Sequence, residues 1–323
     1  MKKTLLSLIL ACFAIGNVMS QEEKIVYDLY HFNYYFMNPA VAGAERCGHF
    51  MLTDRHQWVG IKDAPNTQTF SYRSRPWENV GVGGYIYKDS NGRDNFLGGQ
   101  LSFAYHIPMS DGARYRQSVE LDRQLSFGVS VKFNQRSFDL SDIQGNDPAL
   151  EADNAFYPNA NVGVYYTSYG FFTGLSVTNL VPTSLDIFGK NEPDMPLTGL
   201  FFIGNSFKLG TTTSLEPSIM ARGSDMHGII TDLNVKFTQD VSNDFSYYAL
   251  VSFRESIDLR SEKDKTVEDY QALRIMPMIG IRYDKWNFAY GCGIDMNNMR
   301  NENAGSHQFM IGYTMCIPKQ FCR

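Results

Sequence analysis

The chain has 323 residues and a formal net charge of −5 at pH 7. A negative balance argues against nucleic acid as a partner, because nucleic-acid-binding surfaces are basic. Aromatic residues make up 14% of the chain, and no segment beyond its N-terminal end has the roughly 18 consecutive apolar residues of a transmembrane helix.

The first twenty residues are predicted to be a secretory signal peptide. Lys2 and Lys3 supply the positive start, an apolar run extends from Leu5 to Ile15, and cleavage is expected after Ser20. A lipoprotein site at Cys12 is the alternative, but the apolar run continues past that cysteine. Either reading predicts export. An exported, aromatic-rich chain without helical spans is either a soluble all-β protein or a membrane β-barrel with aromatic girdles.

The segment 21–47 precedes the first predicted strand. Its aromatic residues have no clean period, and an N-terminal extension packed on the domain is the plainest interpretation. The aromatic residues are Tyr27, Tyr30, Phe32, Tyr34, Tyr35 and Phe36.

From residue 48 onward the sequence alternates between apolar and polar residues. In one of the clearest runs, Val129, Val131 and Phe133 share one face of a strand. An even number of antiparallel strands of about ten residues is typical of an outer-membrane barrel, whereas a soluble sandwich would bury its apolar face between two sheets. We predict about fourteen strands, near 48–58, 66–75, 80–88, 96–107, 122–135, 159–168, 170–179, 198–208, 212–221, 228–238, 244–254, 271–283, 286–295 and 306–316.

The predicted connections alternate in length. If the first strand runs outward, the outer connections are mostly long and the inner ones mostly tight, as in outer-membrane barrels. Residues 109–121 break this rule as a long inner connection. The outer connections fall near 59–65, 89–95, 136–158, 180–197, 222–227, 255–270 and 296–305.

Four cysteines remain after the predicted signal peptide. Four cysteines in an oxidising compartment allow three pairings. Cys316 and Cys322 are close in sequence, so a disulfide between them is a possibility that would staple the C-terminus. Cys47 and Cys292 complete the set, and none of the four has the close paired spacing of a zinc site.

Catalysis, a cofactor and a metal site are not expected. The six histidines are scattered, and the acidic loop 139–153 matches no EF-hand spacing. Ser102 and His106 share a strand face, but such pairs arise by chance. The charged loops 139–153 and 255–270 are most simply exposed, solvated loops. The functional alternative is that they contact a surface partner, because binding residues favour loops on a rigid scaffold.

Three motif blocks between residues 34 and 75 resemble the hallmark of the PorP/SprF family of Bacteroidetes outer-membrane proteins. The family pattern is Asn-Pro-Ala-x-Ala-Gly, then Arg-x-Gln-Trp-x-Gly, then Ala-Pro-x-Thr-Gln-Thr. The matching residues are Asn38, Pro39, Ala40, Ala42 and Gly43, then Arg55, Gln57, Trp58 and Gly60, then Ala64, Pro65, Thr67, Gln68 and Thr69.

The resemblance implies a bacterial outer-membrane β-barrel over residues 48–323, with residues 21–47 as a short periplasmic segment at its mouth. It also implies a role in type IX secretion, gliding motility or both. The barrel would bind outer-membrane lipid, a large secreted or surface-anchored cargo such as an adhesin, and periplasmic or lipoprotein components of the machine. A passive porin for small solutes is the rival function.

Within the hallmark, the structural interpretation is a cross-strand polar network of Arg55, Gln57, Thr67 and Thr69 that fixes strand register. The functional alternative is direct contact of Arg55 with a carboxylate of a partner. Trp58, close to a strand end, is expected in an interfacial aromatic belt.

Overall fold

The structure is a computed structural model of the chain. The structure describes residues 29–109, 123–139, 154–183, 195–224, 228–257, 273–296 and 303–316. The predicted signal peptide lies outside these residues. No helix among them is long and apolar enough to cross a membrane.

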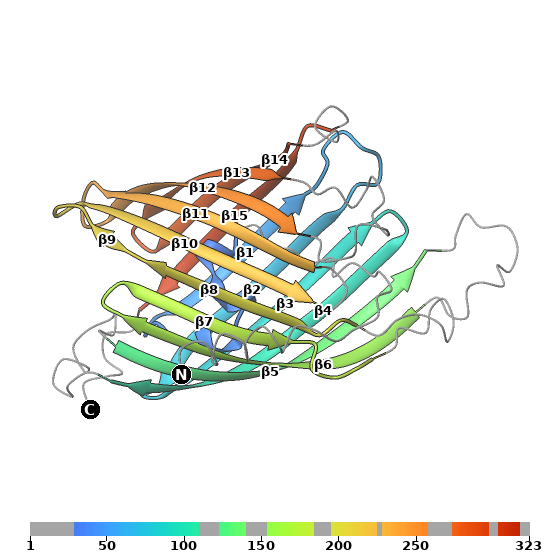
Figure 1. The fold of residues 1–323 in the computed structure, drawn as a ribbon, viewed down its shortest axis with the longest axis horizontal. Coiled ribbons are helices and arrows are strands. Elements are labelled where there is room, and N and C mark those ends of the chain that lie inside the picture. Colours follow the sequence, from blue (N-terminus) through green and yellow to red (C-terminus); the bar gives the residue numbers. More distant parts are fainter. Residues whose placement is uncertain are drawn as a thin grey trace, which may run out of the picture.

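The described residues form a single antiparallel sheet that closes on itself (Figure 1). β8 and β9 pair with β10 in one continuous register, so β8 and β9 together form a single strand of the wall. The barrel therefore has 14 strands, as predicted. The bounds are β1 Gly48–His56, β2 Asn66–Trp77, β3 Val80–Asn91, β4 Asp94–Pro108, β5 Arg123–Phe138, β6 Asn154–Ser168, β7 Phe171–Thr178, β8 Thr198–Asn205, β9 Phe207–Lys208, β10 Thr213–Ser224, β11 Gly228–Asp240, β12 Phe245–Ile257, β13 Arg274–Tyr283, β14 Trp286–Asp295 and β15 Ser306–Met315.

The two faces of the wall differ as the alternation predicts. Large apolar side chains point outward and remain exposed, which a second packed sheet would not allow. Small polar residues and paired charges point inward and are buried. The exposed outer belt includes Leu101, Phe103, Val129, Val131, Leu233, Val235, Phe253, Phe309 and Ile311. A belt of this kind is suited to lipid, which confirms the membrane barrel over the soluble sandwich.

We name the two ends of the barrel after the ends of β1. The Gly48 end carries the short connections 78–79, 169–170, 209–212, 241–244 and 284–285, together with the long one at 109–122. The His56 end carries the long connections 57–65, 139–153, 179–197, 258–273 and 296–305 and two short ones, 92–93 and 225–227. Two outer connections are shorter than predicted: β3 and β4 join by a two-residue turn at 92–93, and β10 and β11 are separated only by residues 225–227. The predicted loop at 89–95 was too long because Asp89 and Asp94 are polar residues that face the lumen, and both are buried.

A disulfide joins the first and last strands. Cys47 and Cys316 are bonded, and Gly48 pairs with Met315 beside them. This corrects the suggested Cys316–Cys322 bridge. Closure of the barrel brings residues 269 positions apart into contact, which sequence proximity does not reveal. Cys322 lies outside the described residues, and Cys292 is the free cysteine among those described.

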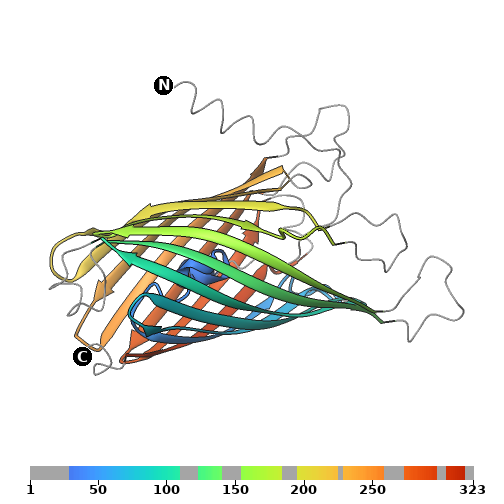
Figure 2. The same cartoon turned by 90° about the horizontal axis from the view of Figure 1, so that it is seen from below.

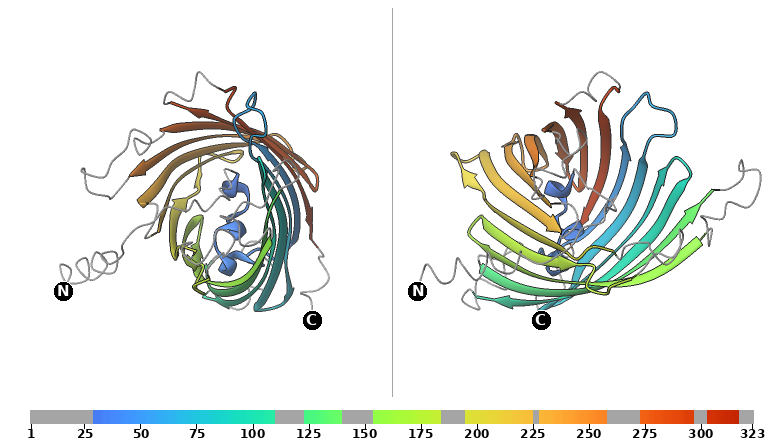
Figure 3. Two further views of the ribbon diagram at one scale, coloured as in Figure 1. Left: turned by 90° about the vertical axis from the view of Figure 1, so that its right-hand side faces the viewer. Right: turned by 45° about the vertical axis from the view of Figure 1, so that its right-hand side comes forward.

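The segment before β1 lies inside the barrel (Figures 2 and 3). It contains three short 3₁₀ helices: η1 Tyr30–Phe32, η2 Tyr34–Phe36 and η3 Pro39–Val41. We call residues 29–46 the plug. The resemblance places residues 21–47 at the barrel mouth, whereas the described part of that segment lies within the lumen. Its aromatic residues lack a period because they meet wall strands on several sides.

Candidate functional site: a plugged barrel lumen

The plug is organised around Asn38, the first residue of the hallmark. Asn38 caps η3: its Oδ1 accepts a hydrogen bond from the amide of Ala40 at 2.9 Å. Pro39 follows at the first helical position, where its missing amide hydrogen costs nothing. The Asn-Pro-Ala sequence therefore encodes a self-capped helical turn.

The same Asn38 side chain fastens the plug to the wall. Its Nδ2 donates to the carbonyl oxygens of Val164 at 2.9 Å and Leu175 at 3.2 Å, on β6 and β7. Ser176 donates from Oγ to the carbonyl of Met37 at 2.6 Å. Asn38 is completely buried. Buried amides of this kind are costly to replace, because both wall carbonyls would lose a donor.

Glycines in the wall make room for the plug. A Cβ built on Gly81 of β3 would lie 1.9 Å from the carbonyl oxygen of Ala42. A Cβ on Gly128 of β5 would lie 2.2 Å from the amide nitrogen of Ala40, and one on Gly163 of β6 would lie 2.0 Å from Oδ1 of Asn38. The hallmark residue Gly43 has φ +67°, a conformation that favours glycine. Plug and wall are therefore matched at the level of backbone contact.

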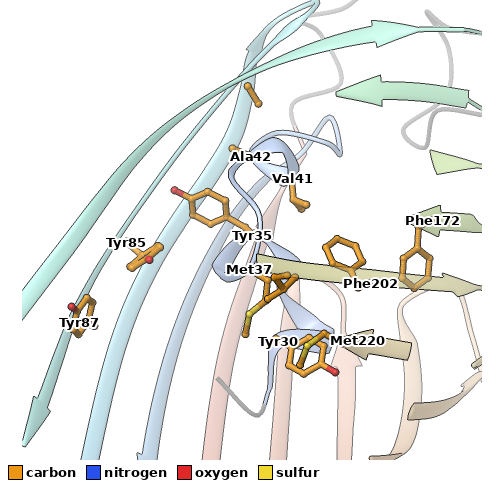
Figure 4. Close-up of a cluster of buried hydrophobic side chains, with 12 residues drawn as sticks. Tyr30, Tyr35, Met37, Val41, Ala42, Tyr85, Tyr87, Phe172, Phe202 and Met220 are labelled. Atoms are coloured by element: carbon orange, nitrogen blue, oxygen red, sulfur yellow. The ribbon is translucent and has the colours of Figure 1, made fainter. Parts of the chain in front are cut away.

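An apolar cluster packs the plug against wall strands on more than one side, including β3, β7 and β8 (Figure 4). Tyr34 stacks on Phe202 of β8, with ring centroids 4.7 Å apart, and lies near Phe172 of β7. In a second apolar cluster, Phe32 packs on Tyr248 of β12, with ring centroids 5.0 Å apart. Asn234 of β11 donates to the hydroxyl of Tyr30. The plug therefore reaches across the lumen.

Polar contacts secure the plug toward the Gly48 end. Nε2–H of His106 donates to the carbonyl of Ala42 at 2.9 Å, so Nδ1 accepts from the hydroxyl of Ser126 at 2.8 Å. Ser102 instead accepts a hydrogen bond from the hydroxyl of Tyr35 at 2.9 Å. The candidate pair Ser102 and His106 is thus not joined by a hydrogen bond, and each residue contacts the plug.

An ion-pair group marks the passage from the plug to β1. Glu45 lies 3.1 Å from Nη2 of Arg73 and 2.7 Å from Nε2 of His49. The Glu45 side chain is half-exposed, and its partial desolvation opposes ionisation; the charges of Arg73 and His49 outweigh this and hold the pKa of the Glu45 carboxyl below its ordinary value. The glutamate is therefore charged at neutral pH, and it anchors the plug where the chain turns into the wall.

The second and third hallmark blocks lie along β1, β2 and their connection. Arg55 faces Thr67 across the strand pair, and Thr67 faces and donates to Asp89 of β3. Arg55, Thr67 and Thr69 are buried on the lumen side, whereas Gln68 points outward. Gln57 follows the end of β1, and the buried hydroxyl of Thr69 has no hydrogen-bond partner among the described residues. The predicted network of Arg55, Gln57, Thr67 and Thr69 therefore stays a prediction, as does a contact of Arg55 with a partner.

The remaining hallmark residues shape the β1–β2 connection. The amide of Gln57 donates to the carbonyl of Pro65, which closes this loop at its base. Trp58 has φ +47° and Gly60 has φ +103°, so the chain turns sharply here. Trp58 is half-buried, and its place in an aromatic belt stays a prediction. Ala64 is half-buried in the same loop.

Charged residues at the His56 end of the lumen are paired across strands. Asp232, Arg254, Arg274 and Asp295 face one another in register across β11 to β14. Arg254 contacts Asp232 at 2.8 Å, and Arg274 contacts Asp295 at 2.6 Å. Opposite charges thus meet inside the lumen, where an unpaired charge would be costly.

The sequence reasoning missed the plug and its glycine contacts. Gly81, Gly128 and Gly163 all occupy inward positions of strands, which was a usable signal for close approach of another backbone. Within the described part of the chain, no cluster of three or more His, Cys, Asp or Glu side chains could hold a metal ion. Most of the acidic loop 139–153 and most of 255–270 lie outside the described residues.

A closed barrel with an apolar outer belt and a plugged lumen defines the class: an outer-membrane β-barrel. The solved structures with similar folds are of this class. The monoaromatic hydrocarbon channel CymD has a TM-score of 0.53 and 10% identity, covering 87% of this chain and 92% of that one. A Pseudomonas aeruginosa FadL homologue has a TM-score of 0.51 and 12% identity, covering 87% and 93%. These likenesses concern the fold alone.

The model of the family described as type IX secretion system membrane protein PorP/SprF matches residues 19–313. The chain therefore belongs to that family, as the hallmark blocks indicate, and it is a secretion-related outer-membrane barrel. No curated protein sequence matches it.

Proposed function

We propose that this barrel binds a large, adhesin-like secreted cargo protein and supports its export or surface anchoring. We further propose that it links this cargo to periplasmic components of the type IX secretion or gliding machinery. Family membership supports a place in the machinery. The observation that carries the binding role is the plug, which is held to wall strands around the lumen. Because the plug occupies the lumen, we expect other proteins to bind the outer surface and the two ends of the barrel.

The rival function, a passive porin, needs a water-filled path through the lumen. The plug contacts β2 through Asn33 and Ser71, β6 and β7 through Asn38, and β11 through Tyr30. Contacts on so many strands argue against easy displacement. Purified barrel in liposomes is therefore expected to show no wide, stable conductance; such a pore would favour the porin.

The orientation proposed here follows from the connections. Outer-membrane barrels have short periplasmic turns and longer external loops. We therefore assign the Gly48 end to the periplasm and the His56 end to the cell surface. The cargo would meet the connections at the His56 end, and the periplasmic components would meet the Gly48 end.

Site-specific crosslinking combined with affinity purification in mild detergent tests both halves of this proposal. A photo-crosslinking residue at Lys62, which is 93% exposed in the β1–β2 connection, is expected to capture a secreted cargo. One at Val241, exposed in the β11–β12 connection, is expected to capture a periplasmic component. Leu101 in the lipid belt is the control position. Identical captured proteins at all three positions, by mass spectrometry, would refute the division of faces.

A further inference from the structure

A groove opens on the outer face of the wall where β8, β10, β11 and β12 meet. It has a volume of about 450 Å³, within the range of about 300–1,000 Å³ typical of ligand pockets. Apolar side chains of the exposed outer belt line it, among them Ile219, Leu233, Val235 and Phe253. The groove is therefore continuous with the lipid-facing surface, and hydrocarbon is what reaches it.

The groove contains Pro217, a residue type that is unusual inside a sheet. Pro217 lies within β10, between two neighbouring strands, and it lacks an amide hydrogen. Gly204 pairs with Ser218 on one side of this position and Phe207 pairs with Leu215 on the other. The same register places Asn205 opposite Pro217. Proline is normally restricted to edge strands or bulges, because inside a sheet it removes a ladder hydrogen bond. Here the structure records no β8–β10 pairing at that step.

Because Pro217 has no amide hydrogen, the carbonyl of Asn205 lacks the hydrogen-bond donor that a residue at position 217 would normally supply. The amide of Ser206 donates to the carbonyl of Gly170, toward β7. Since backbone groups alternate along a strand, the polar groups of Asn205 point the other way, toward Pro217. Pro217 has nothing to donate to the Asn205 carbonyl. A carbonyl lacking a donor in contact with hydrocarbon is costly, so a ligand that brings a donor is favoured there.

We infer that this groove is a lipid site. It binds one acyl chain of an outer-membrane lipid, and a hydroxyl group on that chain donates a hydrogen bond to the carbonyl of Asn205. Chain and hydroxyl contribute separately: the apolar lining accommodates the hydrocarbon, and the Asn205 carbonyl favours a hydroxylated chain over a plain one. This inference does not depend on the cargo-binding role.

Native mass spectrometry of the detergent-purified barrel tests the site. Ile219→Trp fills the groove, and Ile311→Trp is a matched control, since both isoleucines are 44% exposed on the outer belt and Ile311 does not line the groove. Wild type and Ile311→Trp are expected to retain one bound lipid, and Ile219→Trp is expected to lose it. Equal retention by the two tryptophan variants would overturn the inference, as would binding of a partner protein there instead.

Two added probes test the hydroxyl. Methyl 3-hydroxytetradecanoate is expected to bind wild type about fivefold better than methyl tetradecanoate, the difference made by one hydrogen bond. Pro217→Ala restores the amide donor for the Asn205 carbonyl, so it is expected to remove the preference for the hydroxylated probe. The gel mobility of this variant before and after heating checks that the barrel stays folded. Equal binding of the two probes to wild type would refute the role of the carbonyl.

Discussion

Two residues, Asn38 of the hallmark and Gly128 of the wall, explain how the plug is held in the lumen. Asn38 bonds its own helical turn and two strands of the wall at once. Gly128 allows the backbone of Ala40 to lie directly on β5. These two residues act on the same interface from opposite sides, so each provides an independent test of the plug.

Gly128→Val is expected to unseat the plug, because its Cβ would overlap the backbone at Ala40. Overpacking of this kind costs about 1–3 kcal/mol, and the expected functional result is conductance in liposomes where wild type is silent. Gly199→Val is the control, since the nearest atom to a Cβ at that glycine is 3.9 Å away. Silence of both variants, with unchanged unfolding temperatures, would contradict the packing described here.

Asn38→Leu is expected to lower the free energy of unfolding by about 1–3 kcal/mol, because it leaves the carbonyls of Val164 and Leu175 without their donor. The measurement is the temperature at which the barrel changes from its folded to its unfolded gel mobility. Asn95→Leu is the control, because the Asn95 side chain is bonded to an exposed turn carbonyl. An equal shift for both variants would speak against a special role of Asn38.

Elements differ in how far the sequence determines them. Strands such as 128–134 were predictable because lipid on one side and a polar lumen on the other enforce a period of two. The plug was not, because Tyr30, Tyr34 and Tyr35 meet different strands and follow no repeat. The β3–β4 turn was misplaced for a related reason: Asp89 and Asp94 look like loop residues but face the lumen.

The junction of β1 and β15 is the element-scale feature with the clearest test. Cys47→Ser is expected to lower stability by roughly 2–5 kcal/mol, because the bridge restricts the unfolded chain over a long loop. Heat-induced unfolding is followed on gels run with and without reductant. Cys292→Ser, at a cysteine outside the bridge, is expected to behave as wild type. A wild-type barrel that is insensitive to reductant would count against the bridge.

For the whole molecule, the decisive property is the lipid-facing belt. Leu101→Arg, at a position 67% exposed on that belt, is expected to destabilise the inserted barrel by about 2–4 kcal/mol if it lies near the bilayer midplane. Ile61→Arg makes a similar apolar-to-charged change in the β1–β2 connection, outside the strands. The fraction of folded protein in lipid vesicles compares the two; equal folding would contradict the position of the belt.

The bridge between Cys47 and Cys316 makes most of the polypeptide a covalent ring. A protease that cuts once within that ring, for example in the connection 258–273, would leave both fragments attached to each other. Such a nicked molecule runs as a single species until reductant is added. Cleavage of this barrel by a protease at its surface therefore has to be judged on reducing gels.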